Sequence, residues 1–348
     1  MKHITLSIRP KEAIATILKS LPNKRLRDVV ERRFGIRGTA MTLDAIGKTY
    51  GITRERVRQI ENDALRRLQK TDIGEYLAGT LREMANHLAS YGGIAAYDTF
   101  VRTIADESEL SHVELLVTLH PEIKRAPESD EYHPRVYIEK EKLAHADRTM
   151  RAVVQELQSK KALLSESGLV ELVAHTHQSV VGSRPSDDTV ASLVQTSRLV
   201  GKNSYNEYGL LEWPTIKPKS IRDKAYVVLL KSGKPLHFQN VALAIDQSGL
   251  RGKKKAHPQT VHNELIKDSN RFVLVGRGLY ALREWGYEPG TVKDVITGIL
   301  REENKALTKE MIVKAVMQRR FVKENTIMLN LQNRQHFKKN DNGAYYLA

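Results

Sequence analysis

Apolar residues in the segment 10–34 recur with a period of about 3.6, which is typical of an amphipathic α-helix. Pro22 interrupts the pattern, and Gly35 and Gly38 follow its last apolar position. Glycine is favoured where a helix ends in a left-handed backbone conformation. The pattern therefore predicts helical structure over residues 10–34 with a break at Pro22. Its apolar positions are Ile14, Ile17, Leu18, Leu21, Leu26, Val29, Val30 and Phe34.

Two short helices joined by a glycine turn are predicted next. Thr42 is a suitable N-cap for a helix over Leu43–Thr49, and Thr53 is a suitable N-cap for a helix that runs to about Leu68. Gly51 lies between the two helices. One stripe of the second helix is apolar and is expected to face a core, namely Val57, Ile60, Ala64 and Leu68. This order of elements predicts a helix-turn-helix.

The rest of the chain, residues 72–348, is predicted to repeat one order of elements: three helices followed by two short strands. The repeat is clearest at 220–286, where strands at 271–275 and 279–282 flank the turn Gly276–Gly278. That order is the one found in a winged helix. A spacing of about 60–70 residues is longer than the period of solenoid repeats, so each unit is expected to be a small domain.

The predicted fold class is mainly α with small β wings: an N-terminal helix-turn-helix followed by tandem winged-helix domains. The expected domains are 1–70, 72–140, 145–216, 220–286 and 290–348. In the other units, the paired strands are expected at 122–125 with 135–138, 198–201 with 208–213, and 336–339 with 344–347. The last pair flanks Asn340–Gly343, a favoured hairpin turn.

Composition narrows the class of protein. The length of 348 residues suggests two to four domains. No apolar run approaches the ~20 residues that span a bilayer, and the first residues lack the apolar core of a signal peptide. Cysteine is absent, which excludes disulfides and thiolate metal sites. A cytoplasmic location and no membrane partner are expected.

The net charge of +15 is distributed unevenly. Residues 1–20 carry +3, residues 21–70 carry +7, residues 71–216 carry −8 and residues 217–348 carry +13. The basic regions should be attracted to phosphate, whereas the acidic middle should not. A merely soluble basic surface could explain a small excess. The 25 basic against 12 acidic side chains of residues 217–348 favour a nucleic-acid partner instead.

The second helix of the predicted helix-turn-helix carries polar side chains in its first turns, the part that meets base edges in the major groove. Arginine can contact guanine O6 and N7 together, glutamate can accept from cytosine N4, and glutamine can pair with adenine. We therefore predict base contacts by Arg54, Glu55, Arg58 and Gln59. The alternative is a solvated, arginine-rich helix face.

Phosphate contacts are predicted around this helix and in the unit at 220–286. Near the helix they are assigned to Thr42, Thr53, Arg56, Arg66 and Arg67. In the later unit they are assigned to Lys253, Lys254, Lys255 and Arg277, with Arg251, Lys267 and Arg271 as further candidates. Such contacts position a protein on DNA without reading sequence. For the lysine cluster, the alternative is a mobile, solvated loop.

Three segments carry a resemblance to a known family: Val30–Gly38, Thr42–Gly47 and Thr53–Glu61. About fifty residues around them resemble region 4 of the primary sigma factors of bacterial RNA polymerase. The resemblance implies that the second helix reads a −35 promoter element in double-stranded DNA through Arg54, Glu55, Arg58 and Gln59. It also implies that the preceding helices dock on the β-subunit flap of the polymerase.

The resemblance is confined to that region. A sigma factor also uses region 2 to bind the core enzyme and melt the −10 element, and no region 2 pattern is found in the sequence. We therefore expect promoter-like DNA recognition, rather than promoter melting.

A second resemblance is carried by Pro235–Phe238, His257–Leu265 and Arg271–Gly286. These segments resemble the HARE-type helix-turn-helix domain, a winged-helix relative of the N-terminal domain of the RNA polymerase delta subunit. The resemblance implies an association with DNA-linked and transcription proteins.

No catalytic motif is found: there is no GxxxxGK[ST] phosphate loop, HExxH zinc helix or GxSxG nucleophile turn. His175 and His177 are two residues apart and do not share a helix face, so they are a poor metal pair. We expect no enzyme activity, cofactor or metal. The leading hypothesis is a DNA-binding transcription regulator. The alternatives are a polymerase-associated accessory protein without sequence-specific reading and a DNA-processing factor.

Overall fold

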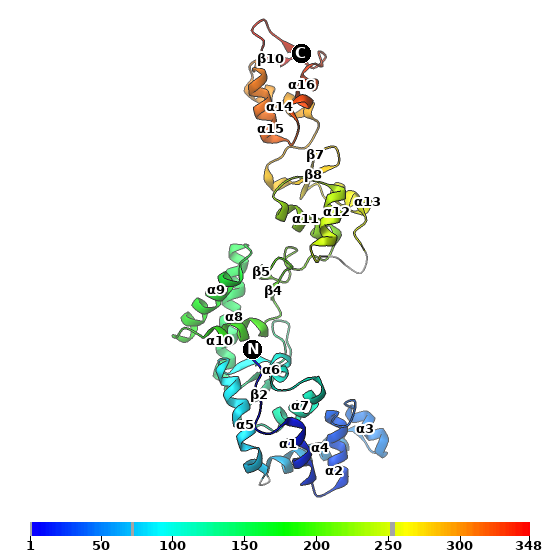
Figure 1. Cartoon of the computed structure of the whole chain (residues 1–348), viewed down its shortest axis with the longest axis vertical. Helices are drawn as coiled ribbons and strands as arrows, with labels where there is room; N and C mark the ends of the chain where they lie inside the picture. Colours follow the sequence, from blue (N-terminus) through cyan, green and yellow to red (C-terminus); the bar gives the residue numbers. More distant parts are fainter. Residues whose placement is uncertain (1, 71–72, 251–254) are drawn as a thin grey trace. The chain divides into compact units, whose positions relative to one another are not determined.

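The computed structural model of the protein describes residues 2–70, 73–250 and 255–348. Helices predominate, and the sheets are small and antiparallel (Figure 1). Contacts divide the chain into two compact units. The N-terminal unit comprises Met1–Gly201 with Tyr208–Leu210, and the C-terminal unit comprises Lys202–Glu207 with Leu211–Ala348. The predicted fold class is confirmed, whereas the predicted domain boundaries stay a prediction.

The N-terminal unit begins with four helices: α1 (Pro10–Lys19), α2 (Lys24–Phe34), α3 (Leu43–Tyr50) and α4 (Arg54–Lys70). The predicted break at Pro22 is confirmed, because Asn23 caps α2 by accepting from the Arg25 amide. Gly35 and Gly51, with φ of 69° and 61°, end α2 and α3 in the left-handed region that glycine tolerates. Side-chain caps and glycines therefore determine where these helices begin and end.

The first winged helix follows in chain order: α5 (Ile73–Ser90), β1 (Ile94–Ala96), α6 (Tyr97–Ile104), α7 (Leu110–Leu119), β2 (Lys124–Ala126) and β3 (Arg135–Tyr137). Its sheet has the order β1-β3-β2, with Ile94 and Lys124 both paired to Tyr137. A two-stranded wing was predicted for this unit, and the structure adds β1 as a third strand. This strand has only three residues, all buried, so it shows no alternation of apolar and polar positions.

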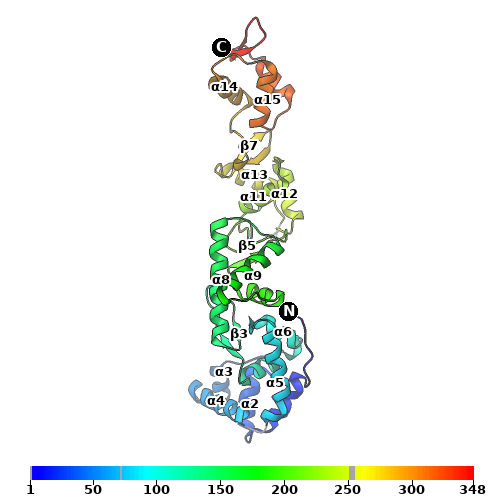
Figure 2. The same ribbon diagram turned by 90° about the vertical axis from the view of Figure 1, so that its left-hand side faces the viewer.

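The second winged helix contains α8 (Lys140–Lys160), α9 (Glu166–Val181), α10 (Asp187–Thr196), β4 (Val200–Lys202) and β5 (Tyr208–Leu210). Leu164 forms an isolated bridge with Tyr208 in place of a first strand. The second wing strand is shorter than the predicted 208–213. Within the N-terminal unit, the first winged helix lies between helices α1 to α4 and the second winged helix in both views (Figure 1, Figure 2).

The C-terminal unit contains the third winged helix: α11 (Ile221–Ser232), β6 (Leu236–His237), α12 (Phe238–Gln247), α13 (Pro258–Lys267), β7 (Phe272–Gly276) and β8 (Leu279–Leu282). Its sheet order is β6-β8-β7, and the predicted strands are confirmed to within one residue. Gly278 has φ of 69°, and a Cβ there would lie 2.5 Å from Nε2 of His237. The close approach of the wing turn to the start of α12 therefore requires glycine.

The fourth winged helix contains α14 (Val292–Glu303), α15 (Lys309–Arg319), α16 (Glu324–Leu331), β9 (Phe337–Lys339) and β10 (Tyr345–Leu347). Thr291 and Asp294 form a capping box at the start of α14. The predicted hairpin is confirmed, with Tyr345 paired to Lys339. No helix within the described parts of the chain is both long and apolar enough to cross a bilayer.

Candidate nucleic-acid interface

The turn between α3 and α4 depends on a buried glycine. The Ile52 amide donates to the Gly47 carbonyl at 3.0 Å, and a Cβ at Gly47 would lie 2.6 Å from the Ile52 carbonyl oxygen. Any larger residue at position 47 would push the turn away from α3. A small core of Val29, Ile46 and Val57 holds the two helices together. The angle at which α4 leaves the domain is therefore fixed by packing.

Helix α4 presents one apolar and one polar face, as predicted. Val57, Ala64 and Leu68 are buried, and Ile60 is half-buried against the same core. The four predicted base-reading side chains, Arg54, Glu55, Arg58 and Gln59, are all exposed in its first two turns. The structure thus brings these four residues together on one accessible surface, here named the reading face.

Ion pairing on the reading face is local. Nε and Nη2 of Arg58 donate to the two Glu55 carboxylate oxygens at 2.8 and 2.7 Å. Hydrogen bonding from Arg58 lowers the pKa of Glu55, which favours the charged carboxylate. Nη1 of Arg56 donates to Oε1 of Gln59 at 3.0 Å. Arg54 makes no hydrogen bond or ion pair with any residue that the structure describes.

The predicted phosphate contacts around α4 are also exposed. The hydroxyls of Thr42 and Thr53 each accept a backbone N–H at 3.2 Å as helix caps, and each keeps its own O–H to donate. Arg66 donates to the Asn62 carbonyl, and Arg67 pairs with Asp63 at 2.9 Å. Helix N-termini at α3 and α4 add partial positive charge beside the two threonines.

Basic residues of α2 that were not predicted as DNA contacts also lie near the start of α3. Arg33 donates to the Met41 carbonyl and pairs with Glu61 of α4, both at 3.3 Å, which places its guanidinium beside the α3 start. Arg25 lies over the Tyr50 ring at 4.9 Å. A surface cleft of about 550 Å³ is lined by Lys24, Arg25, Arg27, Asp28, Glu31, Arg32, Arg37 and Tyr50.

Asp28 organises this basic cleft. Partial burial of Asp28 raises the pKa of its carboxyl group, but hydrogen bonds from Tyr50 and Arg32 outweigh this effect and lower the pKa. The Tyr50 contact joins α2 to the end of α3 across 22 positions of sequence. A pattern read along one helix does not contain this contact, and the basic cleft was therefore not predicted.

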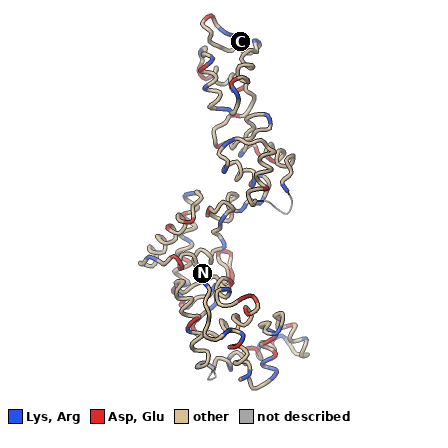
Figure 3. Tube along the Cα trace, viewed as in Figure 1, with Lys and Arg blue, Asp and Glu red and all other residues tan. Residues whose placement is uncertain are grey.

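In the C-terminal unit, the predicted basic residues differ in their surroundings. Lys253 and Lys254, with Arg251, lie outside the described residues. Lys255, Lys267 and Arg277 are exposed, with Arg277 at the tip of the wing turn. Arg271 instead pairs with Asp268 at 2.6 Å and Asp223 at 3.0 Å, which joins the end of α13 to the start of α11. Figure 3 shows the charged residues along the trace.

The described part of the chain holds no group of three or more acidic or histidine side chains arranged for a metal. Burial lowers the pKa of four histidines. Three of them are buried, His87, His112 and His120, and His177 is half-buried. All four lie in the N-terminal unit, outside α3 and α4. The geometry of α3 and α4 therefore remains the feature best suited to a ligand.

Comparisons with known proteins match two parts of the chain. Residues 17–70 match the family model for sigma-70, region 4, and residues 219–285 match the HARE-HTH model, a helix-turn-helix domain named after ASXL and restriction endonuclease proteins among others. RNA polymerase sigma factor RpoD from two Helicobacter pylori strains is 40% identical over 74 residues, 21% of this chain and 11% of that protein. RNA polymerase sigma factor SigA of a Bacillus species is 45% identical over 60 residues, 17% of this chain and 16% of that protein.

Both expected resemblances are confirmed. The protein contains a sigma-70 region 4 helix-turn-helix near its N-terminus and a HARE-type helix-turn-helix in its C-terminal unit. The chain spans 11% to 16% of the length of these sigma factors. The matched families are DNA-binding families rather than enzyme families.

Proposed function

We propose that this protein is a transcription regulator that recognises promoter-like duplex DNA, with a −35-like element as its target. The observation that carries the proposal is the reading face, where Arg54, Glu55, Arg58 and Gln59 stand together on the first turns of a helix held at a fixed angle. These side-chain types match the donor and acceptor patterns of base edges in the major groove.

The exposed pair of Glu55 and Arg58 fits this role. In the free protein the two side chains satisfy each other, and in a complex Arg58 could turn to guanine while Glu55 accepts from cytosine. Because both are exposed, this exchange requires no repacking of the core. Thr42, Thr53, Arg56, Arg66 and Arg67 would hold the backbone phosphates on either side.

The basic C-terminal unit would add affinity without sequence preference. Lys253, Lys254, Lys255 and Arg277 are proposed as phosphate contacts of the third winged helix. Linking such a module to the reading helix raises overall affinity through effective concentration. We propose no catalytic role, and we propose that the protein acts in the cytoplasm.

The test is selection of bound duplexes from a random library at near-physiological salt. The intact protein is compared with Arg54→Ala/Arg58→Ala and with a charge-matched control, Arg66→Ala/Arg67→Ala. We expect a −35-like motif with the intact protein and the control, and none with the reading-face variant. A motif that survives in the reading-face variant, or no motif with any protein, would refute the proposal.

A second candidate is a polymerase-associated accessory protein that does not read sequence. It is favoured by the names of the matched relatives, which are RNA polymerase sigma factors. This function predicts co-purification with core polymerase after nuclease treatment. Recovery of the chain without polymerase subunits would count against it.

A further inference from the structure

In a winged helix, the third helix is the element that normally enters the DNA groove. In the first winged helix this element is α7, and it is not available. His112, Val113, Leu115, Leu116, Val117 and Leu119 of α7 are buried. Six of its ten residues are thus enclosed by the protein, and the polar Ser111, Glu114 and Thr118 share the remaining side. Helix α7 therefore has a packing role.

Helix α7 packs on α6 of its own winged helix and, outside it, on α1, α2 and α4 of the sigma-like region. One continuous hydrophobic core contains Ile14 and Ile17 of α1, Phe34 of α2, Leu68 of α4 and Leu116 of α7. Burial of such side chains is the main favourable term in packing one element on another. The apolar side of the sigma-like helices is thus covered by the same chain, while the reading face stays exposed.

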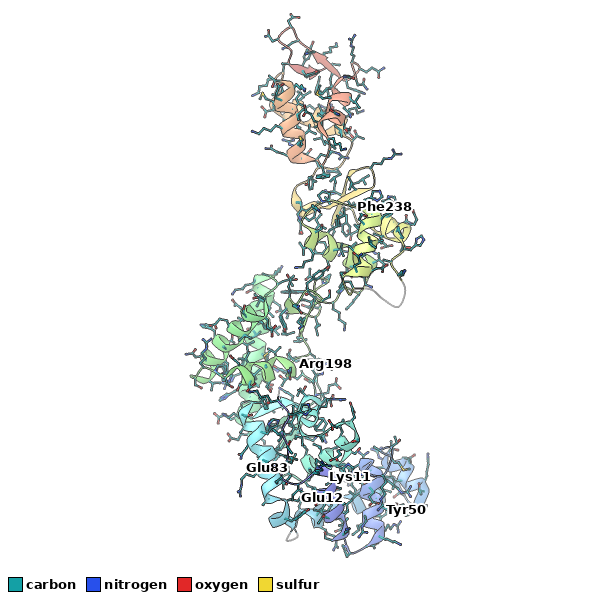
Figure 4. All side chains as sticks on the ribbon, viewed as in Figure 1. Lys11, Glu12, Tyr50, Glu83, Arg198 and Phe238 are labelled. Carbon is teal, nitrogen blue, oxygen red and sulfur yellow. The ribbon has the colours of Figure 1, made fainter. Side chains whose placement is uncertain are left out.

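The segment before α1 reinforces this packing. The Lys2 amide donates to the Tyr91 hydroxyl at 2.7 Å, the Ile4 amide to the Thr103 carbonyl at 2.9 Å, and the Ser7 amide to Glu83 at 2.8 Å. At the first turn of α1, the Lys11 amide donates to Glu109 at 3.3 Å (Figure 4 labels Lys11 and Glu83). Residues 2–9 therefore run along the first winged helix before α1 begins.

The second winged helix uses its third helix, α10, in the same way. Thr189, Val190, Ser192, Leu193 and Thr196 of α10 are buried, and α10 packs on β1. Oγ of Ser192 donates to the Ile94 carbonyl at 2.6 Å. A Cβ at Gly92 would lie 2.6 Å from the Thr189 methyl, so glycine permits the contact.

Backbone pairing continues just after α10. The His133 amide donates to the Thr196 carbonyl at 3.0 Å, and the Arg198 amide donates to the Glu131 carbonyl at 2.8 Å. The Arg198 side chain, labelled in Figure 4, also pairs with Glu128 at 2.7 Å. The second winged helix is thereby fixed to the wing of the first.

We propose that α7 and α10 are internal docking helices, and that α7 permanently occupies the apolar side of the sigma-like helix-turn-helix. The first two winged helices then form a scaffold that presents the reading face, and neither reads DNA. An outside protein could bind the apolar side of α1, α2 and α4 only by displacing α7. This proposal rests on packing and does not depend on which DNA sequence is read.

The test locks α1 to α7 in the full chain. Because the chain has no cysteine, Lys11→Cys/Glu109→Cys can be joined by a short bismaleimide without side reactions. We expect nearly complete intramolecular cross-linking. We also expect DNA affinity and association with core RNA polymerase to stay within about twofold of the unlinked protein. Lys11→Cys alone, treated identically, is the control.

Two results would overturn the proposal. A tenfold or larger loss of DNA or polymerase binding on cross-linking would show that α7 must leave for function. Failure to cross-link in a variant whose melting temperature matches the parent would show that α1 and α7 do not stay together. Neither result bears on base reading, which the selection experiment tests separately.

Discussion

The winged helices of the two units share one order of elements but use the third helix differently. In the N-terminal unit, six of the ten residues of α7 and five of the ten residues of α10 are buried. In the C-terminal unit, α13 buries only Val261 and Leu265, and α16 buries only Ile327 and Leu331. The remaining positions of α13 and α16 are half-buried or exposed. The same topology therefore serves as a scaffold in one unit and leaves its usual DNA-binding helix accessible in the other.

The winged helices of the two units also differ in net charge. Residues 71–216 carry a net charge of −8 and residues 217–348 carry +13. Basic residues increase DNA affinity only where the domain can contact DNA. A winged helix with an accessible third helix therefore benefits from positive charge, whereas one with a buried third helix does not. We infer that the charge difference reflects the difference in use.

The largest expected effect comes from placing a charge on the two kinds of third helix. Leu116 of α7 is 0% exposed, and Leu329 of α16 is 67% exposed. Leu116→Asp should lower the free energy of unfolding by at least about 4 kcal/mol because it buries an unpaired carboxylate. Leu329→Asp should change it by less than about 0.5 kcal/mol. Urea unfolding of both variants checks this, and equal losses would contradict the comparison.

The next effect is on sequence recognition. Arg58→Ala should weaken binding to the selected duplex by about tenfold to a hundredfold and relax preference at one base pair. Arg66→Ala, near the other end of the same helix, should weaken binding to all duplexes alike. Competition binding against single-position substitutions measures both. A uniform loss with Arg58→Ala would remove base reading by this residue.

A smaller effect is expected from exposed basic residues of the C-terminal unit. Lys255→Ala/Lys267→Ala/Arg277→Ala should lower affinity for every duplex and reduce the slope of log affinity against log salt by about 0.9 per lost contact. The matched triple in the N-terminal unit, Lys142→Ala/Lys160→Ala/Arg184→Ala, should leave the slope unchanged. Equal effects of the two triples would mean that the units do not differ in DNA contact.

The smallest expected effect is the loss of stability of the N-terminal unit at low pH. Nδ1 of His120 accepts from the Glu122 and Ile123 amides at 3.0 and 2.9 Å, and Nε2 lies 2.9 Å from the Leu81 carbonyl, an arrangement that requires the neutral ring. Burial lowers the pKa of His120 below that of the unfolded chain, about 6.5. As pH falls below that value, the unfolded state binds the proton first, so stability is lost.

Urea unfolding at pH 7 and pH 5 should show this loss. His120→Gln should reduce the difference between the two pH values, whereas His175→Gln, at an exposed position, should preserve it. If His120→Gln loses as much stability between pH 7 and pH 5 as the parent protein, His120 is not responsible for the pH dependence.

Much of the architecture could be predicted because its signals are local. Thr42, Gly51 and Thr53 mark the helix-turn-helix through capping and a left-handed turn, and the structure has these features at those residues. The hairpin at Gly276–Gly278 has the same kind of signal. The reading face followed from the period of α4, because exposure on a helix is set by position relative to the apolar stripe.

The remaining features depend on contacts between distant segments. Arg271 was predicted as a phosphate contact, yet Asp223, 48 positions earlier, holds it in an ion pair. The burial of α7 did leave a trace in the sequence, since most residues of Leu110–Leu119 are apolar. The apolar composition predicts that the helix is buried, but it does not say which elements cover it. The structure shows that α1, α2 and α4 pack on it.

The most direct test of the different use of third helices is hydrogen–deuterium exchange of the full chain with and without the selected duplex. The account predicts that DNA slows exchange in the first turns of α4 and in the third and fourth winged helices, including α13 and α16. It predicts no change in α7 and α10, which should already exchange slowly in the free protein. Slowed exchange in α7 or α10 on DNA binding, or fast exchange there in its absence, would contradict it.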